Sequence, residues 1–222
     1  MTEDTSRPDP LAVRQPKQAR SKARLEAILD AAEGLIAVDG MAHLTMSDVA
    51  ARAKISIGSL YQYVPTPQAL LRALATRFLS QWRRDIERFM ADVTSPQELS
   101  DAIARLLWSI YDTMRARPQL REIWAHMHAD RDLAALDLED SRSNVALIVD
   151  ALVRVGAIDD SDRDTVTTDV LLITHLSGSA IQMATGVGDG DGKKIVQAYI
   201  EVAAARAGLP APSVASSSLD TV

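Results

Sequence analysis

The residues best suited to chemistry lie in one short stretch, Ala50 to Val64, which is rich in hydroxyl, phenol and amide side chains. Ser56 can cap a short helix that runs on to Val64. Several donors near the start of a helix form a site for an anion, and DNA phosphate is the anion we expect there. Gly58 would let such a helix approach a backbone closely. A small helical corner that only packs against the rest of the chain would show the same pattern.

The remainder of the sequence contains no recognisable catalytic arrangement. We find no Gly-rich phosphate loop, no nucleophile elbow and no carboxylate cluster at ligand spacing. Cysteine is absent, which excludes disulfides and thiolate metal sites. His126 and His128 are two residues apart, so on a helix their side chains point away from each other. We therefore expect no catalytic residues, no metal, no cofactor and no enzymatic activity.

The charge of the chain is unevenly distributed. The 222 residues carry 24 Lys and Arg against 30 Asp and Glu, and a net charge of −6 argues weakly against a polyanionic partner. Between Pro10 and Leu25, however, the five charged residues are all basic: Arg14, Lys17, Arg20, Lys22 and Arg24. A basic arm suits phosphate contacts, although a solvated flexible tail is the simpler interpretation.

The apolar segments indicate a chain that does not enter a membrane. No apolar run approaches the roughly 18 residues of a spanning helix. The first 15 residues carry acids and prolines and lack the apolar centre of a secretory signal. We expect a cytoplasmic location.

Apolar spacing of three and four residues, with no sustained two-residue alternation, predicts an all-α fold of nine helices. The first three helices, at 19–38, 46–53 and 57–64, form a helix-turn-helix pattern, and Thr45 can cap the second. Six longer helices follow, with a glycine-rich loop expected at 186–192. The domains we expect are a disordered basic arm at 1–18, a DNA-binding domain at 19–65, a helical body at 66–208 and a disordered tail at 209–222.

The segment Thr45 to Val64, followed by a proline and a long apolar helix, resembles the N-terminal signature of the TetR family of bacterial transcriptional regulators. That signature looks like Thr-x-x-x-[Ile/Val]-Ala-x-x-Ala-Gly-Val-Ser-x-Gly-[Ser/Thr]-[Leu/Ile]-Tyr-x-[Tyr/His]-Phe. The chain matches it at Thr45, Val49, Ala50, Ala53, Ser56, Gly58, Ser59, Leu60, Tyr61 and Tyr63.

The resemblance implies that the third helix enters the major groove of DNA. Groove-facing residues would then be Ser56, Ile57, Ser59 and Gln62, and phosphate-facing residues would be Thr45, Tyr61 and Tyr63. Of these, Gln62 is the best candidate for a base edge, because an amide can pair with adenine through two hydrogen bonds. Ile57 would contact a thymine methyl group.

The chain departs from the family pattern at three positions. Lys54 stands where the family usually has a turn glycine, although its charge would lie near the DNA. Val64 replaces a usual Phe, and Pro67 stands where many members carry a phosphate-binding Lys. These departures keep open an alternative, a helical ligand-binding or scaffolding protein that has lost DNA binding.

The resemblance also implies a homodimer that binds a near-palindromic operator and is released by a small-molecule effector, as a repressor would be. The last two long helices would pair across the dimer, where the small residues 177–180 would permit close approach. A greasy effector pocket would be lined by Trp108, Tyr111, Met114, Trp124, Met127 and His175. For each of these residues taken singly, ordinary core packing is the simpler interpretation.

Overall fold

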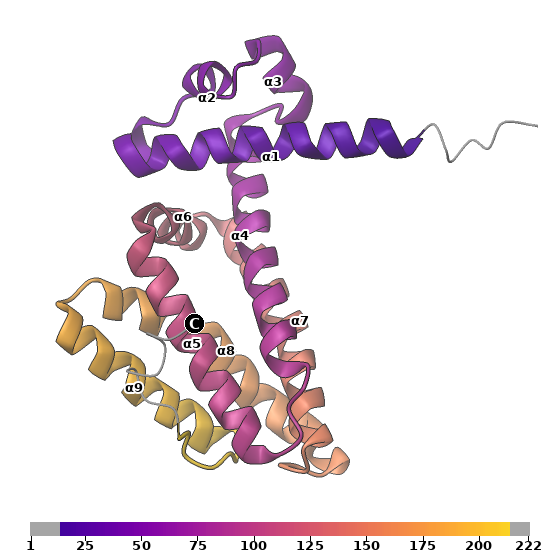
Figure 1. The fold of residues 1–222 in the computed structure, drawn as a ribbon, viewed down its shortest axis with the longest axis vertical. Helices are drawn as coiled ribbons and strands as arrows, with labels where there is room; N and C mark the ends of the chain where they lie inside the picture. The colour runs from indigo at the N-terminus through magenta and orange to yellow at the C-terminus, as the bar shows by residue number, and fades with distance from the viewer. Residues whose placement is uncertain (1–13, 214–222) are drawn as a thin grey trace, which may run out of the picture. The chain divides into compact units, whose positions relative to one another are not determined.

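The computed structural model describes residues 14–213, with side chains described from Ala19 onward. Over this range the protein has nine α-helices, two 3-10 helices and no strand, which confirms the all-α fold (Figure 1). The chain divides into two compact units, and the division falls within one helix, between Leu74 and Ala75. Among the described residues, no helix is long and apolar enough to cross a membrane.

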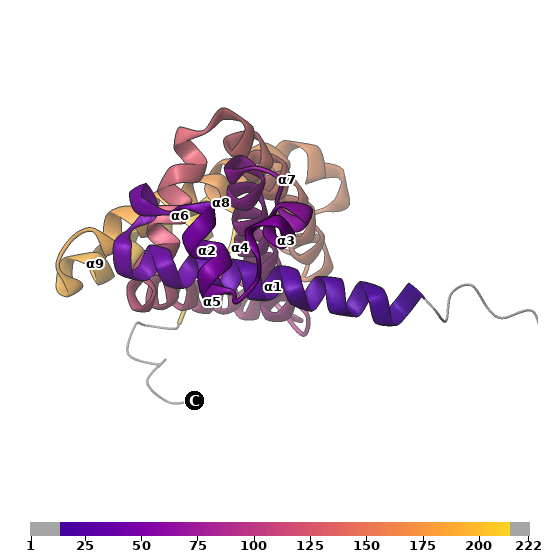
Figure 2. The same cartoon turned by 90° about the horizontal axis from the view of Figure 1, so that it is seen from above.

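The first unit is built around one long helix, α1 (Arg14–Asp39), which is seen along its whole length in Figures 1 and 2. A 3-10 turn (Met41–His43) leads to the short helices α2 (Met46–Arg52) and α3 (Ile57–Tyr63). The caps predicted at Thr45 and Ser56 are confirmed, since each hydroxyl accepts a hydrogen bond from the backbone three residues on, at 3.2 and 3.1 Å. The core of this unit is Ile28, Ala32, Ile36, Val49, Leu60 and Val64.

Helix α1 begins at Arg14, not at the predicted Ala19, and so includes the end of the segment predicted to be disordered. Arg, Gln, Lys and Ala in this stretch are good helix formers, and Pro16 falls in the first turn, where a missing N–H costs little. The rest of the predicted arm, residues 1–13, lies outside the described residues.

The second unit is a bundle in which α8 lies between α7 and α9 and also packs on α5 (Figures 1 and 2). Pro96 and Pro118 open two of its helices, and the Ser95 hydroxyl caps the first of these by accepting from the Glu98 amide. The helices after α3 are α4 (Pro67–Met90), α5 (Pro96–Ala116), α6 (Pro118–Ala129), α7 (Arg131–Arg154), α8 (Arg163–Thr185) and α9 (Asp189–Arg206).

The loop predicted at 186–192 is wrong in its second half, because α9 already begins at Asp189. Gly192 is buried, and a Cβ there would collide with the Ala184 carbonyl oxygen and lie 2.6 Å from the Tyr111 hydroxyl. This glycine therefore permits the close approach of α9 to the end of α8. An ion pair between Arg115 of α5 and Asp189 also holds the start of α9 against α5.

The C-terminal segment predicted to be disordered from 209 is instead packed against α5 as far as Ser213. Leu209 is buried, the Ser100 hydroxyl donates to the Pro210 carbonyl at 2.6 Å, and the Ser213 amide donates to Asp101 at 2.7 Å. One apolar side chain and four hydrogen bonds order a few residues that composition alone suggests are mobile. Residues 214–222 lie outside the described residues.

Candidate nucleic-acid interface and ligand cavity

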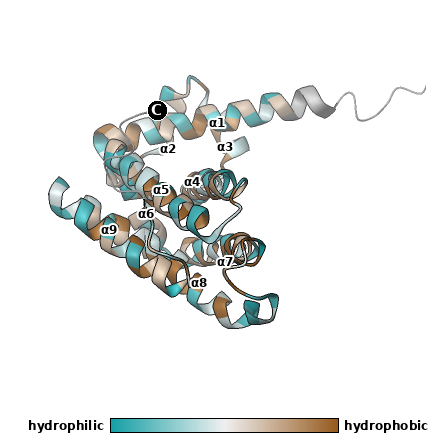
Figure 3. Cartoon of the chain, turned by 60° about the horizontal axis from the view of Figure 1, so that its bottom comes forward, coloured by the Kyte–Doolittle hydropathy of each residue, from teal (hydrophilic) through white to brown (hydrophobic). Residues whose placement is uncertain are grey.

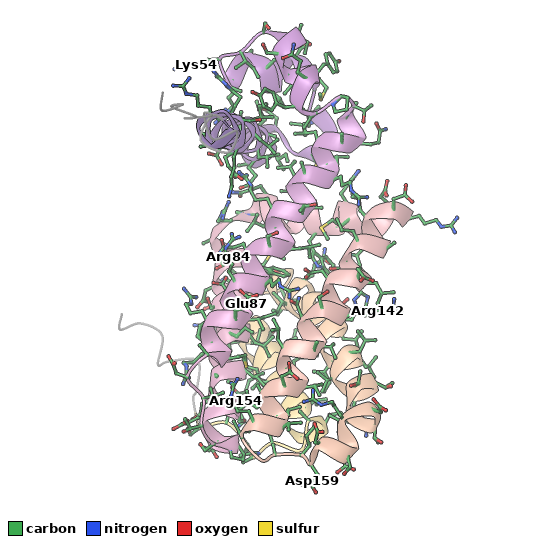
Figure 4. The ribbon with its side chains drawn as sticks, turned by 90° about the vertical axis from the view of Figure 1, so that its right-hand side faces the viewer. Lys54, Arg84, Glu87, Arg142, Arg154 and Asp159 are labelled. Carbon is green, nitrogen blue, oxygen red and sulfur yellow. The ribbon has the colours of Figure 1, made fainter. Side chains whose placement is uncertain are left out.

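The turn between α2 and α3 holds Lys54 at φ 55°, the one non-glycine residue of the described range in the left-handed region. The Lys54 amide donates to Ala51 and the Ile55 amide to Ala50, at 3.1 and 3.0 Å, so the turn is closed by hydrogen bonds. Lysine therefore takes a left-handed conformation that glycine adopts without strain, at a cost of roughly 1 kcal/mol. Its side chain is exposed, and Figure 4 labels it at this turn.

Helix α3 has one buried face and one exposed face. Leu60 is fully buried, whereas Ile57 is 42 % and Tyr61 46 % exposed, and Gln62 is exposed beside them. Tyr63 is half-buried. Large apolar side chains on the surface of a short helix are suited to a partner, and this exposed face carries the residues predicted to face the groove.

Three of the predicted hydroxyl contacts are already engaged within the chain. The Ser56 hydroxyl accepts from the Ser59 amide and donates to the Ser59 hydroxyl, both at 3.1 Å. The Thr45 hydroxyl donates to Asp48 at 2.6 Å. Tyr61 and Gln62 make no side-chain hydrogen bond within the described residues and keep their polar groups available.

The first unit requires a glycine at position 34 but not at the predicted contact Gly58. A Cβ on Gly58 would meet nothing within 4 Å, so nothing in the described chain demands a glycine there. By contrast, a Cβ on Gly34 of α1 would lie 2.7 Å from the Arg52 guanidinium, which packs over that glycine. Arg20 and Lys22 are exposed on α1.

The second unit contains a cavity of about 100 Å³. Of the six residues predicted to line a pocket, Trp124 and His175 do so. The other four, Trp108, Tyr111, Met114 and Met127, are almost fully buried in the core and do not line it. Helix α5 instead presents its neighbouring positions to the cavity: Ile103, Leu106, Leu107 and Ile110.

The cavity has apolar walls and one polar side. Helices α4 and α5 supply mostly apolar side chains, and α7 and α8 supply most of the polar groups. The aromatic residues of the lining are Trp82 of α4, Trp124 of α6 and Tyr199 of α9. The Asn144 amide donates to Asp140 at 2.8 Å, while its buried oxygen has no partner. Burial raises the pKa of Asp140 above its usual value. This side therefore offers at least one acceptor to a ligand.

Three ionisable side chains from different helices meet beside the cavity: His128 of α6, Asp137 of α7 and His175 of α8. His128 Nε2 and His175 Nδ1 lie 3.4 and 3.5 Å from the same Asp137 oxygen. The hydrogen bond to Asp137 raises the pKa of His128, against the opposing effect of burial. Sequence reasoning missed His128 and Asp137, because no local spacing links positions that only the tertiary fold brings together.

Comparison with protein families gives two matches that together span most of the chain. Residues 28–74 match the model for bacterial regulatory proteins of the tetR family. Residues 97–206 match the model for the tetracyclin repressor-like C-terminal domain.

Among curated proteins, an uncharacterized HTH-type transcriptional regulator of Mycobacterium tuberculosis, found in two strains, is 35 % identical over 96 residues. That match covers 43 % of this chain and 45 % of the relative, so it spans less than half of the length of either. Similar solved structures include SmeT, the repressor of the Stenotrophomonas maltophilia multidrug efflux pump SmeDEF, with a TM-score of 0.63, 17 % identity and coverage of 83 % and 90 %.

A complex of SmeT with triclosan is similar to the same degree, with a TM-score of 0.62, 17 % identity and coverage of 82 % and 90 %. RolR in complex with the ligand resorcinol gives a TM-score of 0.57, 17 % identity and coverage of 88 % and 98 %. At these identities the structures share the fold of the chain, from the helix-turn-helix unit through the helical body.

Proposed function

Because the chain belongs to the TetR family of bacterial transcriptional regulators, we propose that it is a homodimeric repressor, released from operator DNA when a small molecule fills the cavity. The observation that carries this proposal is the exposed face of α3. Ile57, Tyr61 and Gln62 are exposed there, on a helix whose opposite face is buried. A protein that acts on bacterial operators would work in the cytoplasm.

One group of residues would read the base sequence of the DNA, and a second group would contact its phosphates. Gln62 and Ile57 would read base edges and methyl groups in the major groove, and Tyr61 would donate to a phosphate. Lys54, Arg20 and Lys22 would supply positive charge, which contributes affinity but no sequence preference. The open space at Gly58 supports a close approach of the DNA backbone to the start of α3.

The outer surface of α8 and α9 supports a dimer. On α8, Leu172, Leu176 and Met183 follow at one- and two-turn spacing and are 44–58 % exposed, and Val202 on α9 is 64 % exposed. Figure 3 shows hydrophobic segments along both helices. Such a stripe on one chain is typical of an interface with a second copy.

The small residues 177–180 would contribute less to this proposed interface than the sequence predicts. A Cβ on Gly178 would lie 2.8 Å from the Trp124 ring, so Gly178 is required inside the subunit. Of the four residues, Ser179 is the exposed one. The dimer face that we propose therefore rests on the apolar side chains of α8 and α9.

Helix α4 would connect ligand binding to DNA release. It begins at Pro67, directly after α3, and farther along it carries four cavity-lining residues, Leu79, Trp82, Ile86 and Met90. A ligand that contacts these side chains better in one position of α4 than in another shifts the population towards that position. Release follows if the favoured position is unsuited to DNA.

The cavity favours a small, mainly apolar aromatic ligand that carries a hydroxyl group. Trp82 and Trp124 offer aromatic surface, and the unpartnered Asn144 oxygen would accept a hydrogen bond from the hydroxyl. The complexes of SmeT with triclosan and of RolR with resorcinol support an aromatic ligand for this fold.

The proposal is tested with the full chain and the DNA that flanks its own gene. We expect a salt-sensitive gel shift at one near-palindromic site, a dimer by light scattering, and release of the DNA by a phenol that also raises the melting temperature. A chain that shifts no sequence at any salt concentration, but still binds such a phenol, would support the alternative of a ligand-binding protein without DNA binding.

A further inference from the structure

The cluster of His128, Asp137 and His175 has the form of a metal site. The three side chains come from α6, α7 and α8, and one potential ligand atom from each lies within 4.8 Å of the other two. Asp137 is buried, whereas His128 and His175 are partly exposed. We propose that this cluster binds one divalent first-row transition metal ion, with Zn²⁺ as the reference ion.

The distances suit a metal with short bonds. In a tetrahedral site with bonds of about 2.0–2.1 Å, neighbouring ligand atoms stand about 3.3 Å apart. The two histidine nitrogens lie 3.4 and 3.5 Å from the Asp137 oxygen. Both separations from Asp137 therefore fit a tetrahedral site, and the two nitrogens, which lie within 4.8 Å of each other, would complete it by moving closer together.

The hydrogen bonds of the two histidines determine what each nitrogen needs before it can bind a metal ion. His128 Nδ1 lies 3.0 Å from the Trp124 carbonyl oxygen, which can only accept, so Nδ1 carries a proton, and a metal ion would replace the proton between Nε2 and Asp137. His175 Nδ1 lies 3.2 Å from the Ser141 hydroxyl, and metal binding through this nitrogen requires the hydroxyl to turn its proton away. A second nitrogen that donates to a backbone carbonyl is the usual support of a metal-binding histidine.

The choice of ligands selects the class of metal. Two neutral imidazoles and one carboxylate favour first-row ions such as zinc, whereas magnesium and calcium prefer oxygen atoms alone. Three protein ligands leave at least one position for water or another molecule. Asp137 and His175 also line the cavity, so that open position would adjoin it.

A protonated His128 paired with Asp137 is the competing explanation of the same geometry. A proton on Nε2 would satisfy His128 and Asp137 but would give His175 no part in the arrangement. A metal ion engages all three side chains. The two explanations therefore differ in whether His175 is needed.

Calorimetric titration of the untagged full chain with zinc chloride, and with magnesium chloride for comparison, tests the proposal. We expect one Zn²⁺ per chain and no Mg²⁺ binding. Changes that only reorient a ligand cost roughly 10–100-fold in metal affinity. Asp137→Asn and His175→Gln should therefore weaken zinc binding at least about 100-fold.

His126→Gln is the matched control, because His126 lies two residues from His128 on α6 and is exposed outside the cluster. It should bind zinc as the wild type does. Melting curves recorded without metal show whether each variant is folded. The proposal is overturned if the folded wild type binds no zinc, or if His126→Gln loses as much affinity as His175→Gln. The site does not depend on DNA binding, so failure of the gel shift leaves this result unaffected.

Discussion

The first unit of this protein exposes unpartnered polar groups on its surface, whereas the second unit buries polar groups beside a cavity. On α3 of the first unit, Gln62 and Tyr61 point outward with no partner in the described chain. In the second unit, the Asn144 oxygen and Asp137 are buried beside an apolar cavity. A long polyanion can be met only by groups on a surface, whereas a small molecule is held best where it is surrounded. The first unit is thus suited to a large partner and the second unit to a small one.

The largest effect that we expect comes from Gly192, a glycine that the packing of the enclosed second unit requires. Gly192→Ala in the second unit would place a Cβ against the Ala184 carbonyl oxygen and the Tyr111 hydroxyl. We expect it to lower the free energy of unfolding by about 3 kcal/mol, at the upper end of the cost of overpacking. Denaturant unfolding followed by circular dichroism measures the loss.

Two exposed glycines serve as controls. Gly190→Ala, two residues earlier in α9, and Gly58→Ala in α3 meet no atom within 4 Å and should raise stability by about 0.5–1 kcal/mol. For Gly58→Ala we also expect weaker DNA binding, because the added methyl group stands where we place the DNA backbone. A large loss of stability in Gly58→Ala would contradict the contrast between the two units.

Gln62→Ala tests whether the exposed face of α3 reads sequence. We expect it to remove about 1–3 kcal/mol of discrimination at one base pair of the operator, while the salt dependence of binding stays unchanged. Competition binding with single-base operator variants measures this. Gln81→Ala, on an exposed position of α4 in the second unit, should leave discrimination intact. An equal loss of affinity on every sequence would assign Gln62 to the phosphates instead.

Lys54→Gly separates backbone strain from charge at the turn. Glycine accepts a φ of 55° without strain, so we expect the free energy of unfolding to rise by about 0.5–1 kcal/mol. The salt slope of DNA binding should fall by about one, as for the loss of one phosphate contact. Lys54→Ala should lose the same contact without the gain in stability. A Lys54→Gly variant that is less stable than the wild type would contradict our inference that the backbone is strained at Lys54.

The smallest effect concerns the C-terminal segment on α5. Burial acts to raise the pKa of Asp101, but hydrogen bonds from Ser213 and Gln97 outweigh it and hold the pKa below its usual value. A lowered pKa stabilises the fold above about pH 4 and loses that effect as the pH falls through the folded-state value. The difference in melting temperature between wild type and Asp101→Asn should therefore shrink below about pH 4. A difference that does not change with pH would exclude this role.

The first unit could be predicted almost completely from sequence, because local rules determine it. The hydroxyls of Thr45 and Ser56 cap their own helices, Pro65 follows the third helix, and the apolar spacing of α1 indicates its buried side. The chief departure from the family pattern, Lys54, has a left-handed backbone of the kind that a glycine favours. The sequence predicts the start of α1 too late, because three prolines and little apolar content within residues 1–18 indicate a disordered arm, although a first turn tolerates Pro16.

In the second unit the helices could be predicted but the site could not. Spacing indicates that Trp108 and Tyr111 are apolar positions of α5 but does not say which face of that helix borders a cavity. Gly190 and Gly192 suggested a loop, because the atoms that require a glycine at 192 belong to α8 and α5. His128 and Asp137 meet His175 only through the packing of three helices.

The position of Trp124 makes the second unit visible to fluorescence. Its ring lies 3.8 Å from the His128 ring, packs on Gly178 and lines the cavity. The protein has three tryptophans; Trp82 also borders the cavity, and Trp108 is buried in the core away from it. A ligand in this cavity should therefore change the intrinsic emission of Trp82 and Trp124 with no attached dye, whereas Trp108 does not line the cavity.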